Sequence, residues 1–389
     1  MQGGSEWDGP EAEVMKRRET RQIKVGGVRI GGGSPVSIQS MTKVETSDVK
    51  ALVAQIKRLE KAGCEIVRVA VKNFKDASAV KSIKRKIKIP LVCDIHFNYK
   101  LAIEAIKNGA DKIRLNPGNI RKRDEVAQVV KAAKRAKIPI RIGLNSGSVL
   151  TNDERPLDFA RGRRTTPARL RSDYREAGGN DERISSELVN SAMRCIRLFE
   201  ELAFRDIIIS LKASDVVTTV EAYRRIARLC DYPLHLGVTA AGPYDEGIVK
   251  SSIGIGGLLL DGIGDTIRVS LTSDPVDEVI AAKRILAAVG ARNFGPDIIS
   301  CPLCGRCQVD LIKIVKELES KLFTIHHSPF TKRPLRIAMM GCEVNGPGEA
   351  MGADIGIAFG KGSGMLFKKG KVLKKVTIAN AVKELLKNL

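Results

Sequence analysis

The most constraining feature of the chain is a repeated alternation of short apolar runs with longer amphipathic stretches over its first 271 residues. The runs are rich in Val, Ile and Leu, as strands are, and the stretches between them carry apolar residues at helical spacing. Strands that are apolar on both faces, each followed by a helix, predict a parallel sheet with helices on both sides. The expected strands are residues 36–41, 66–71, 91–97, 112–115, 140–144, 207–211, 234–238 and 266–271.

The number of strands decides between two parallel architectures. Eight such strands, alternating with helices, predict an α/β fold that closes as an N-terminal (β/α)8 TIM barrel, not an open doubly wound sheet. The expected helices include residues 49–62, 100–109, 123–136, 185–202, 216–229 and 247–260. A Gly- and Pro-rich stretch at 290–302 then leads to a small α/β domain with helices at 310–322 and 378–389 and strands near 335–340 and 354–359. We therefore predict a loose charged tail at residues 1–20, a TIM-barrel substrate-binding domain at 21–290 and a second domain at 291–389.

Four of the eight cysteines gather in the second domain. Cys301, Cys304 and Cys307 lie in the segment CPLCGRC, and Cys342 follows in a Gly- and Pro-rich turn. Thiolates at C-x-x-C spacing bind soft metals, and a later cysteine can complete the ligand set from elsewhere in the fold. The pattern predicts a metal or iron–sulfur site. Structural zinc is the alternative, although the uneven spacing favours a cluster.

The compartment bears on how these cysteines are used. Residues 1–10 are polar, with no apolar run like that of a signal peptide, and no stretch approaches the roughly 18 apolar residues of a membrane span. We therefore expect a cytoplasmic protein that does not associate with membranes, in which C-x-x-C favours metal or redox use over a structural disulfide. The remaining cysteines are single residues among apolar neighbours, as buried structural thiols usually are: Cys64, Cys93, Cys195 and Cys230.

The net charge of +22, from 66 Lys and Arg against 44 Asp and Glu, predicts an anionic partner. Nucleic acid, a membrane surface and a phosphorylated metabolite all fit that charge. The aromatic content of 4% supplies few stacking platforms for single-stranded nucleic acid, which argues against that partner. Part of the charge is expected on solvated surface, namely eight lysines between residues 361 and 387. The role of the Arg-rich loop at 161–175 stays open between surface and partner contact.

Polar residues follow the expected strands at their carboxyl ends, where TIM barrels place their sites. Arginines facing a barrel mouth are costly unless they meet an anion, and the guanidinium group matches phosphate oxygens well. Pairing of each arginine with a barrel carboxylate is the alternative interpretation. His96, between Asp94 and Asn98 at a strand end, favours a functional role over a buried structural histidine.

At five places the chain resembles the 4-hydroxy-3-methylbut-2-enyl diphosphate synthase family of the methylerythritol phosphate route to isoprenoids. The resemblance extends from about residue 20 to residue 360, and the two cysteine motifs together are the most specific part of it. The chain looks like the bacterial two-domain form. The motifs are DIHF at 94–97, RLNPGN at 114–119, GDTIRVSL at 264–271, CPLCGR at 301–306 and GCEVNGPGEA at 341–350.

The resemblance implies a TIM barrel followed by a [4Fe–4S] cluster domain. It implies reductive ring opening and dehydroxylation of 2-C-methyl-D-erythritol 2,4-cyclodiphosphate to 4-hydroxy-3-methylbut-2-enyl diphosphate, with two electrons from reduced ferredoxin or flavodoxin. It also implies a head-to-tail homodimer in which one cluster domain caps the partner's barrel. The implied cluster ligands are Cys301, Cys304, Cys342 and Glu349. A carboxylate is a hard ligand that holds iron more weakly than a thiolate, so a substrate oxygen can replace it.

The resemblance also assigns roles in the barrel. Asp94 and His96 would line the reacting end, and Asn345 would approach the substrate from the cluster domain. The residues that would hold the diphosphate are Arg68, Arg114, Arg141, Asn145, Lys212, Arg268 and Ser270.

Two positions depart from the family pattern. After the seventh strand the family usually has a glutamate where this chain has Ala240, and a methyl group cannot transfer a proton. Glu246 or Asp245, in the same loop, could supply the carboxylate, and water or His96 could supply the proton instead. The second departure is Cys307, which could compete with Glu349 as the fourth ligand.

Two other function classes stay open. The first is an iron–sulfur electron carrier or sulfite-reductase-like protein that has lost the dehydroxylation, which Ala240 favours. The second is a basic zinc- or cluster-bearing nucleic-acid-binding protein, which the net charge favours and the low aromatic content disfavours.

Overall fold

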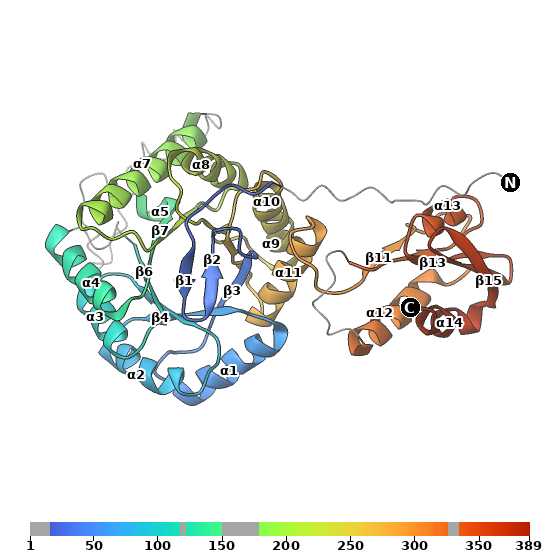
Figure 1. Ribbon diagram of the computed structural model, residues 1–389, viewed down its shortest axis with the longest axis horizontal. Helices are drawn as coiled ribbons and strands as arrows, with labels where there is room; N and C mark the ends of the chain where they lie inside the picture. Colours follow the sequence, from blue (N-terminus) through green and yellow to red (C-terminus); the bar gives the residue numbers. More distant parts are fainter. Residues whose placement is uncertain (1–15, 117–121, 150–178, 326–333) are drawn as a thin grey trace, which may run out of the picture. The chain divides into compact units, whose positions relative to one another are not determined.

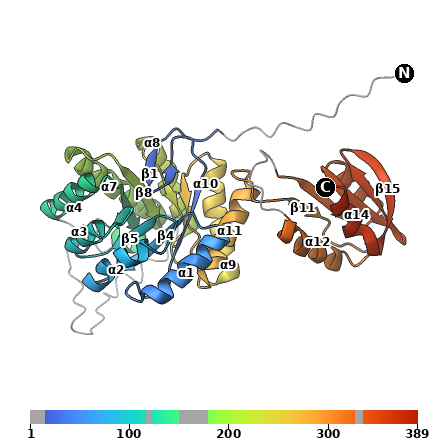
Figure 2. The same ribbon diagram turned by 60° about the horizontal axis from the view of Figure 1, so that its bottom comes forward.

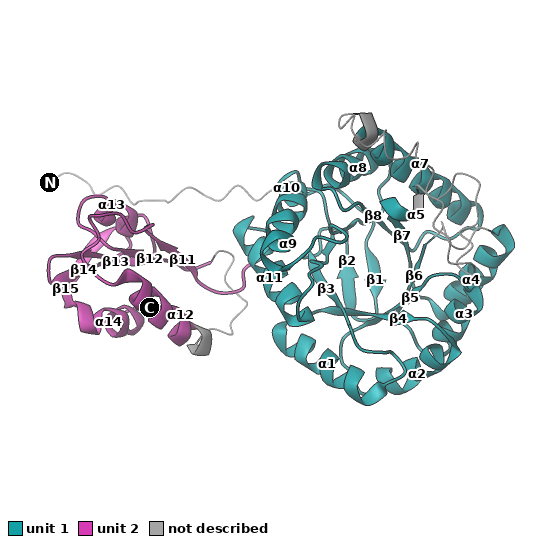
Figure 3. Ribbon diagram, turned by 180° about the vertical axis from the view of Figure 1, so that it is seen from behind, with its two compact units in different colours: residues 1–292 teal, residues 293–389 magenta. Residues whose placement is uncertain are grey.

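The computed structural model describes residues 16–116, 122–149, 179–325 and 334–389. The chain divides into two compact units, Met1–Arg292 and Asn293–Leu389, drawn in teal and magenta in Figure 3. None of the described helices has the length and apolar character needed to cross a membrane.

The first unit contains a parallel sheet of eight strands in the order β8-β7-β6-β5-β4-β3-β10-β9. A parallel bridge between Ile209 and Leu234 joins the two ends of this sheet, so the strands close into a ring. Strands that follow one another along the chain are neighbours in the ring, which confirms the predicted TIM barrel. The strands are β3 (Ser37–Met41), β4 (Ile66–Val71), β5 (Leu91–Ile95), β6 (Lys112–Leu115), β7 (Ile140–Asn145), β8 (Ile207–Lys212), β9 (His235–Leu236) and β10 (Thr266–Ile267).

Helices surround the strands, as Figure 1 and Figure 2 show. The first, α1 (Val49–Ala62), illustrates the local signals: the Asp48 side chain accepts from the N–H of Ala51, and Gly63 ends the helix at φ 94°. Its buried face consists of Leu52, Val53, Ile56 and Leu59. The other barrel helices are α2 (Phe74–Lys84), α3 (Tyr99–Lys107), α4 (Arg123–Ala136), α5 (Ser146–Val149), α7 (Gly179–Glu201), α8 (Val216–Leu229), α9 (Tyr244–Ser251), α10 (Gly257–Leu260) and α11 (Pro275–Ala288).

The helix expected at 247–260 is divided. A π-helical turn, Ser252–Gly256, lies between α9 and α10. Two of its five residues are glycines, and a Cβ on Gly254 would lie 2.9 Å from a methyl carbon of Val238. The wide turn therefore occurs where the helix backbone packs closely against the chain that follows β9.

The amino end of the barrel is filled by apolar side chains. An antiparallel hairpin of β1 (Ile23–Val25) and β2 (Val28–Ile30) precedes the barrel strands, and its Ile23, Val25 and Ile30 belong to one buried cluster. That cluster also contains Ile66, Val92 and Ile208, which lie at the first or second position of β4, β5 and β8.

Residues 16–20, which we expected to belong to a loose tail, make specific contacts. Arg17 donates to the carbonyl oxygen of Gly264 and to Asp265, at 3.0 and 3.1 Å. Arg18 donates to the carbonyl oxygens of Ala227, Cys230 and Tyr232, near the end of α8. Residues 1–15 lie outside the described residues.

The second unit has a five-stranded sheet in the order β11-β12-β13-β14-β15. The first three strands are parallel, and β14 and β15 follow as antiparallel neighbours. The strands are β11 (Asp297–Ser300), β12 (Arg336–Met340), β13 (Ile355–Gly360), β14 (Ser363–Lys368) and β15 (Lys371–Thr377).

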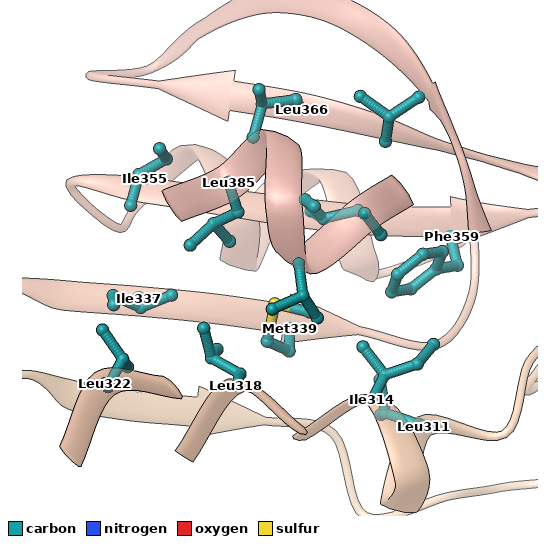
Figure 4. Close-up of a cluster of buried hydrophobic side chains, with 14 residues drawn as sticks. Leu311, Ile314, Leu318, Leu322, Ile337, Met339, Ile355, Phe359, Leu366 and Leu385 are labelled. Carbon is teal, nitrogen blue, oxygen red and sulfur yellow. The ribbon is translucent and has the colours of Figure 1, made fainter. Parts of the chain in front are cut away.

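The two faces of this sheet are covered by different helices. On one face α12 (Leu311–Ile325) and α14 (Ala381–Lys387) pack against Ile337, Met339 and their neighbours, as Figure 4 shows. On the other face α13 (Gly346–Met351) packs through Ala350 against Ala338 and Met340. Successive side chains of β12 point to opposite faces of the sheet, as they do in any β-strand.

Candidate active site

A cavity of about 190 Å³ lies within the barrel, toward the carboxyl ends of its strands. It brings together nine of the residues that the sequence assigned to a site. These are Arg68, Asp94, His96, Arg114, Arg141, Asn145, Lys212, Arg268 and Ser270. Met41, Gly143, Ser210 and Thr239 complete the lining. Alternation along each strand explains the set, because Arg141, Gly143 and Asn145 of β7 face the same side, as do Ser210 and Lys212 of β8.

Asp94 is a carboxylate of the cavity lining. Its oxygens lie 3.1 Å from Arg114 and 3.5 Å from Arg68, and its side chain is 4% exposed. Burial alone would raise the pKa of Asp94, but the positive charges of Arg114 and Arg68 outweigh burial and hold that pKa at about 2. Asp94 is therefore ionised at neutral pH and holds two guanidinium groups in place.

His96 lies 3.7 Å from the same carboxylate and is about half exposed. Burial, with the nearby charges of Arg114 and Arg68, lowers the pKa of His96, while Asp94 opposes that shift. The imidazole is therefore neutral at pH 7, and a neutral imidazole can both donate and accept a hydrogen bond.

The cavity lining is strongly unbalanced in charge. Its basic side chains are Arg68, Arg114, Arg141, Lys212 and Arg268, whereas Asp94 is the one carboxylate among the described lining residues. Burial, followed by the charge of Arg114, lowers the pKa of Arg141 to about 9. Burial, followed by the charge of Arg268, lowers the pKa of Lys212 well below its usual value. An anion in the cavity would relieve this repulsion, so the site is built for a negatively charged ligand.

Two residues behind the lining support its arginines. Arg141 is 1% exposed and donates to the Gln39 side chain on the opposite side of the barrel, at 3.2 Å. Glu278 of α11 is also 1% exposed and lies 3.6 Å from Arg268, while Ser40 donates to it at 3.1 Å. Glu278 was not predicted from the sequence. The sequence signal that could have indicated it is a carboxylate within the largely apolar α11.

Gly143 makes room for Arg114. The guanidinium donates to the carbonyl oxygen of Gly143 at 2.8 Å, and a Cβ at this position would overlap the Arg114 Nε atom. The role of this glycine could not be read from the sequence, because it depends on a side chain from the neighbouring strand.

The loop after β9 does not carry its carboxylates into the cavity. Thr239 lines the cavity, whereas Ala240 is exposed and has a φ of 48°. Asp245 and Glu246 lie in the first turn of α9, and both are exposed and absent from the lining.

The cysteine motifs of the second unit meet at the carboxyl ends of two parallel strands. Cys301 directly follows β11, and Gly341 directly follows β12. The N–H of Gly341 donates to the Cys301 sulfur at 3.2 Å. A Cβ on Gly341 would lie 3.4 Å from the Cys301 sulfur and would overlap the sulfur of Cys307. The thiols of Cys301 and Cys307 therefore both lie beside the glycine that precedes Cys342.

The donor atoms at this edge suit a group held by thiolates. Backbone N–H groups of Val344, Asn345 and Gly346 lower the pKa of Cys342, with a smaller contribution from the charge of Arg306, which favours the thiolate. Cys304 is exposed, and Glu349 is exposed in the first turn of α13. Asn345 is the N-cap residue of α13, and its side chain makes no capping hydrogen bond. Within the described residues, no three His, Cys, Asp or Glu side chains already converge as a metal site. The residues fit a soft-metal cluster in the type of their donors, and Cys301, Cys307 and Cys342 lie at or beside Gly341.

Comparison with known proteins identifies the family. The GcpE TIM-barrel domain matches residues 20–283, and the GcpE protein C-terminal domain matches residues 297–389. The chain belongs to the GcpE family. This membership confirms the resemblance noted in the sequence.

Curated GcpE relatives match the chain over nearly its full length. One from Thermodesulfovibrio yellowstonii is 52% identical over 97% of this chain and 99% of its own length. One from Fusobacterium nucleatum is 51% identical over 95% of this chain and 96% of its own length. Both are named 4-hydroxy-3-methylbut-2-en-1-yl diphosphate synthase (flavodoxin). Among solved structures, a dihydropteroate synthase from Stenotrophomonas maltophilia matches 69% of this GcpE chain and 97% of its own, with 13% identity and a TM-score of 0.48.

Proposed function

We propose that this GcpE chain is a 4-hydroxy-3-methylbut-2-enyl diphosphate synthase. It reduces 2-C-methyl-D-erythritol 2,4-cyclodiphosphate with two electrons and two protons, opens the ring and releases one water. The observation that carries the proposal is the barrel cavity, whose described lining includes five basic side chains and one carboxylate. Such a cavity suits a small metabolite with two phosphate groups, and full-length identity near 50% to curated synthases supports the same substrate.

In this proposal the barrel binds and orients the cyclodiphosphate. The phosphate oxygens accept from the basic groups, with Asn145 and Ser270 as neutral donors. Asp94 holds Arg114 and Arg68 in place for this contact, because it stays ionised between them. The basic groups assigned to the diphosphate are Arg68, Arg114, Arg141, Lys212 and Arg268.

Proton delivery is assigned to the open side of the cavity. Neutral His96, beside Asp94, can hold a proton near the hydroxyl that leaves as water. The carboxylate that the family supplies at position 240 comes, in this proposal, from Glu246 in the first turn of α9. Because Glu246 lies outside the cavity lining, this role requires the first turn of α9 to move toward the substrate.

We propose that the second unit holds a [4Fe–4S] cluster through Cys301, Cys304, Cys342 and Glu349, with Asn345 reaching toward the substrate. When bound, such a cluster supplies electrons singly to the carbon–oxygen bond that breaks. Reduced flavodoxin or ferredoxin would provide those electrons. The cavity and the cysteines belong to different units, and the homodimer that the family implies would bring a cluster domain to a partner's barrel.

One observation favours a second candidate, an electron carrier that keeps the cluster without the dehydroxylation. Ala240 cannot transfer a proton, and neither acidic residue of the following turn lines the cavity.

Anaerobic reconstitution tests both candidates. We expect a brown protein with about four irons and four sulfides per chain, which turns over the cyclodiphosphate with dithionite and methyl viologen. A loaded cluster without turnover would favour the electron carrier, and a colourless protein with one zinc would refute the cluster. Arg114→Met should weaken substrate binding at least about 10-fold with the cluster spectrum unchanged. The matched control Arg224→Met, at an exposed ion pair with Asp261, should not.

A further inference from the structure

The last strand and helix of the second unit carry an excess of positive charge that the proposed reaction does not use. Residues 361–389 contain eight lysines and one side-chain carboxylate, Glu384, which pairs with Lys374. Within the described part of the chain, Lys371 and Lys375 have no ion-pair partner. Between them, Val372 and Leu373 are 59% and 47% exposed. We call residues 371–375 of β15 the basic edge.

The register of the sheet relates the basic edge to the cysteine motifs. Met340 pairs with Ala358, Ala358 with Met365, and Met365 with Lys375. A second row joins Ser300, Met339, Ile357, Leu366 and Lys374. Because Ser300 and Met340 directly precede Cys301 and Gly341, the carboxyl end of β15 lies level with both cysteine motifs. At about 4.8 Å per strand, β15 is about 14 Å from β12 along the sheet.

One end of the basic edge shares a face with α13, whereas Lys371 pairs with Lys368 in the row of Ile355, on the opposite face of the sheet. Lys375 lies in the row of Met340 and Ala358, two residues of the cluster that packs against Ala350 of α13. Glu349, the residue before Ala350, is one of the proposed cluster ligands. A protein docked on β15 would therefore sit beside the helix that carries this ligand.

The composition of the basic edge selects the kind of partner. Exposed apolar residues flanked by lysines resemble a small protein interface with a charged rim, and the charge steers an acidic partner toward it. Nucleic acid fits less well, because Phe367 is the one aromatic residue between 361 and 389 and it is buried. Lysines on an edge strand can also serve only to block pairing with other sheets. That role does not require apolar residues to be exposed between them.

We propose that the basic edge is the docking surface for an acidic electron-transfer protein that delivers one electron at each encounter. The inference rests on the proposed function, since a two-electron reduction needs two such deliveries per turnover. The rate of encounter therefore enters kcat/KM for the donor, and added salt should lower it.

The test is a charge reversal measured with two reductants. In the cluster-loaded protein, Lys371→Glu combined with Lys375→Glu should lower kcat/KM for photoreduced acidic flavodoxin at least about 10-fold at low ionic strength. The difference should shrink as salt is added. Turnover with dithionite and methyl viologen should stay unchanged, because a small reductant needs no docking surface. Iron content and the thermal midpoint should match those of the parent.

A matched control places the same charge change on the barrel unit. Lys57→Glu combined with Lys61→Glu alters two exposed residues of α1 and should leave flavodoxin kinetics unchanged. Unaltered flavodoxin kinetics in the β15 variant would overturn the proposal, as would an equal loss with both reductants or with the α1 control. Loss of nucleic-acid binding alone would make the basic edge a nucleic-acid surface and overturn it too. If the cluster-loaded parent protein did not turn over the cyclodiphosphate with dithionite and methyl viologen, the proposed function itself would be contradicted.

Discussion

Replacing Gly143 with alanine should weaken substrate binding through a side chain that the mutation does not change. The added methyl group would overlap Nε of Arg114, whose side chain is only 5% exposed and has little space to move. Arg114 donates to Asp94 at 3.1 Å and to the carbonyl oxygen of Gly143 at 2.8 Å. The guanidinium must leave at least one of these partners, and its direction toward the cavity changes with it.

The size of the effect follows from the contacts that are lost. A hydrogen bond that involves a charged group contributes about 1.5–3 kcal/mol. If the diphosphate loses one such bond to Arg114, its dissociation constant should rise about 10- to 150-fold. Asp94 also loses part of its compensation in a buried site, so the free energy of unfolding should fall by about 1–3 kcal/mol.

Titration calorimetry under anaerobic conditions measures the dissociation constant, and thermal unfolding measures stability. Gly257→Ala is the matched control, because Gly257 begins α10 at φ −58° and nothing lies within 4 Å of an added Cβ. Unchanged affinity in Gly143→Ala, alongside weak binding by Arg114→Met, would show that Arg114 adapts. Unchanged affinity in both would remove Arg114 from the binding set.

Three further predictions follow from the site. The pKa of Asp94, at about 2 when folded against 3.8 ordinarily, means that its ion pairs stabilise the fold above about pH 4. This stability should be lost as the pH falls toward 2, and Asp94→Asn should remove that part of the acid dependence in thermal melts. Cys342→Ser should lose the cluster while Cys307→Ser keeps about four irons per chain; the opposite result in Cys307→Ser would indicate all-thiolate ligation. Glu246→Gln should slow turnover by about 10²–10⁴-fold with little change in binding, and Ala240→Glu should add little. A nearly inert parent that Ala240→Glu restores would contradict this assignment.

The strand–helix alternation made most of the barrel predictable, and the elements it missed have no distinct apolar period, each for a different reason. In α2 the buried face is Asp76, Ala77, Val80 and Ile83. Because this face includes a small and a charged residue, the sequence of α2 shows no clear apolar periodicity. In α11 apolar residues occur on nearly every side, which blurs the period. The β1–β2 hairpin has only three residues per strand, too few for alternation to be distinctive.

The cavity was predictable because a parallel barrel brings every strand's carboxyl end to one place, so position along a strand is enough to locate Arg114 or Arg268. Contacts between distant parts of the chain were not. Glu278 reaches Ser40 across 238 residues of sequence, and the N–H of Gly341 reaches the Cys301 sulfur across 40. No period or spacing encodes such contacts.

The hairpin that fills the amino end of the barrel also bears on the order of events in catalysis. Ile23, Val25 and Ile30 pack on Ile66, Val92 and Ile208, so the barrel is closed at its amino end. Substrate must arrive, and product must leave, through the same mouth at the carboxyl ends of the strands. The two therefore exclude each other, so we expect the product to inhibit competitively and to depart before each new turnover begins.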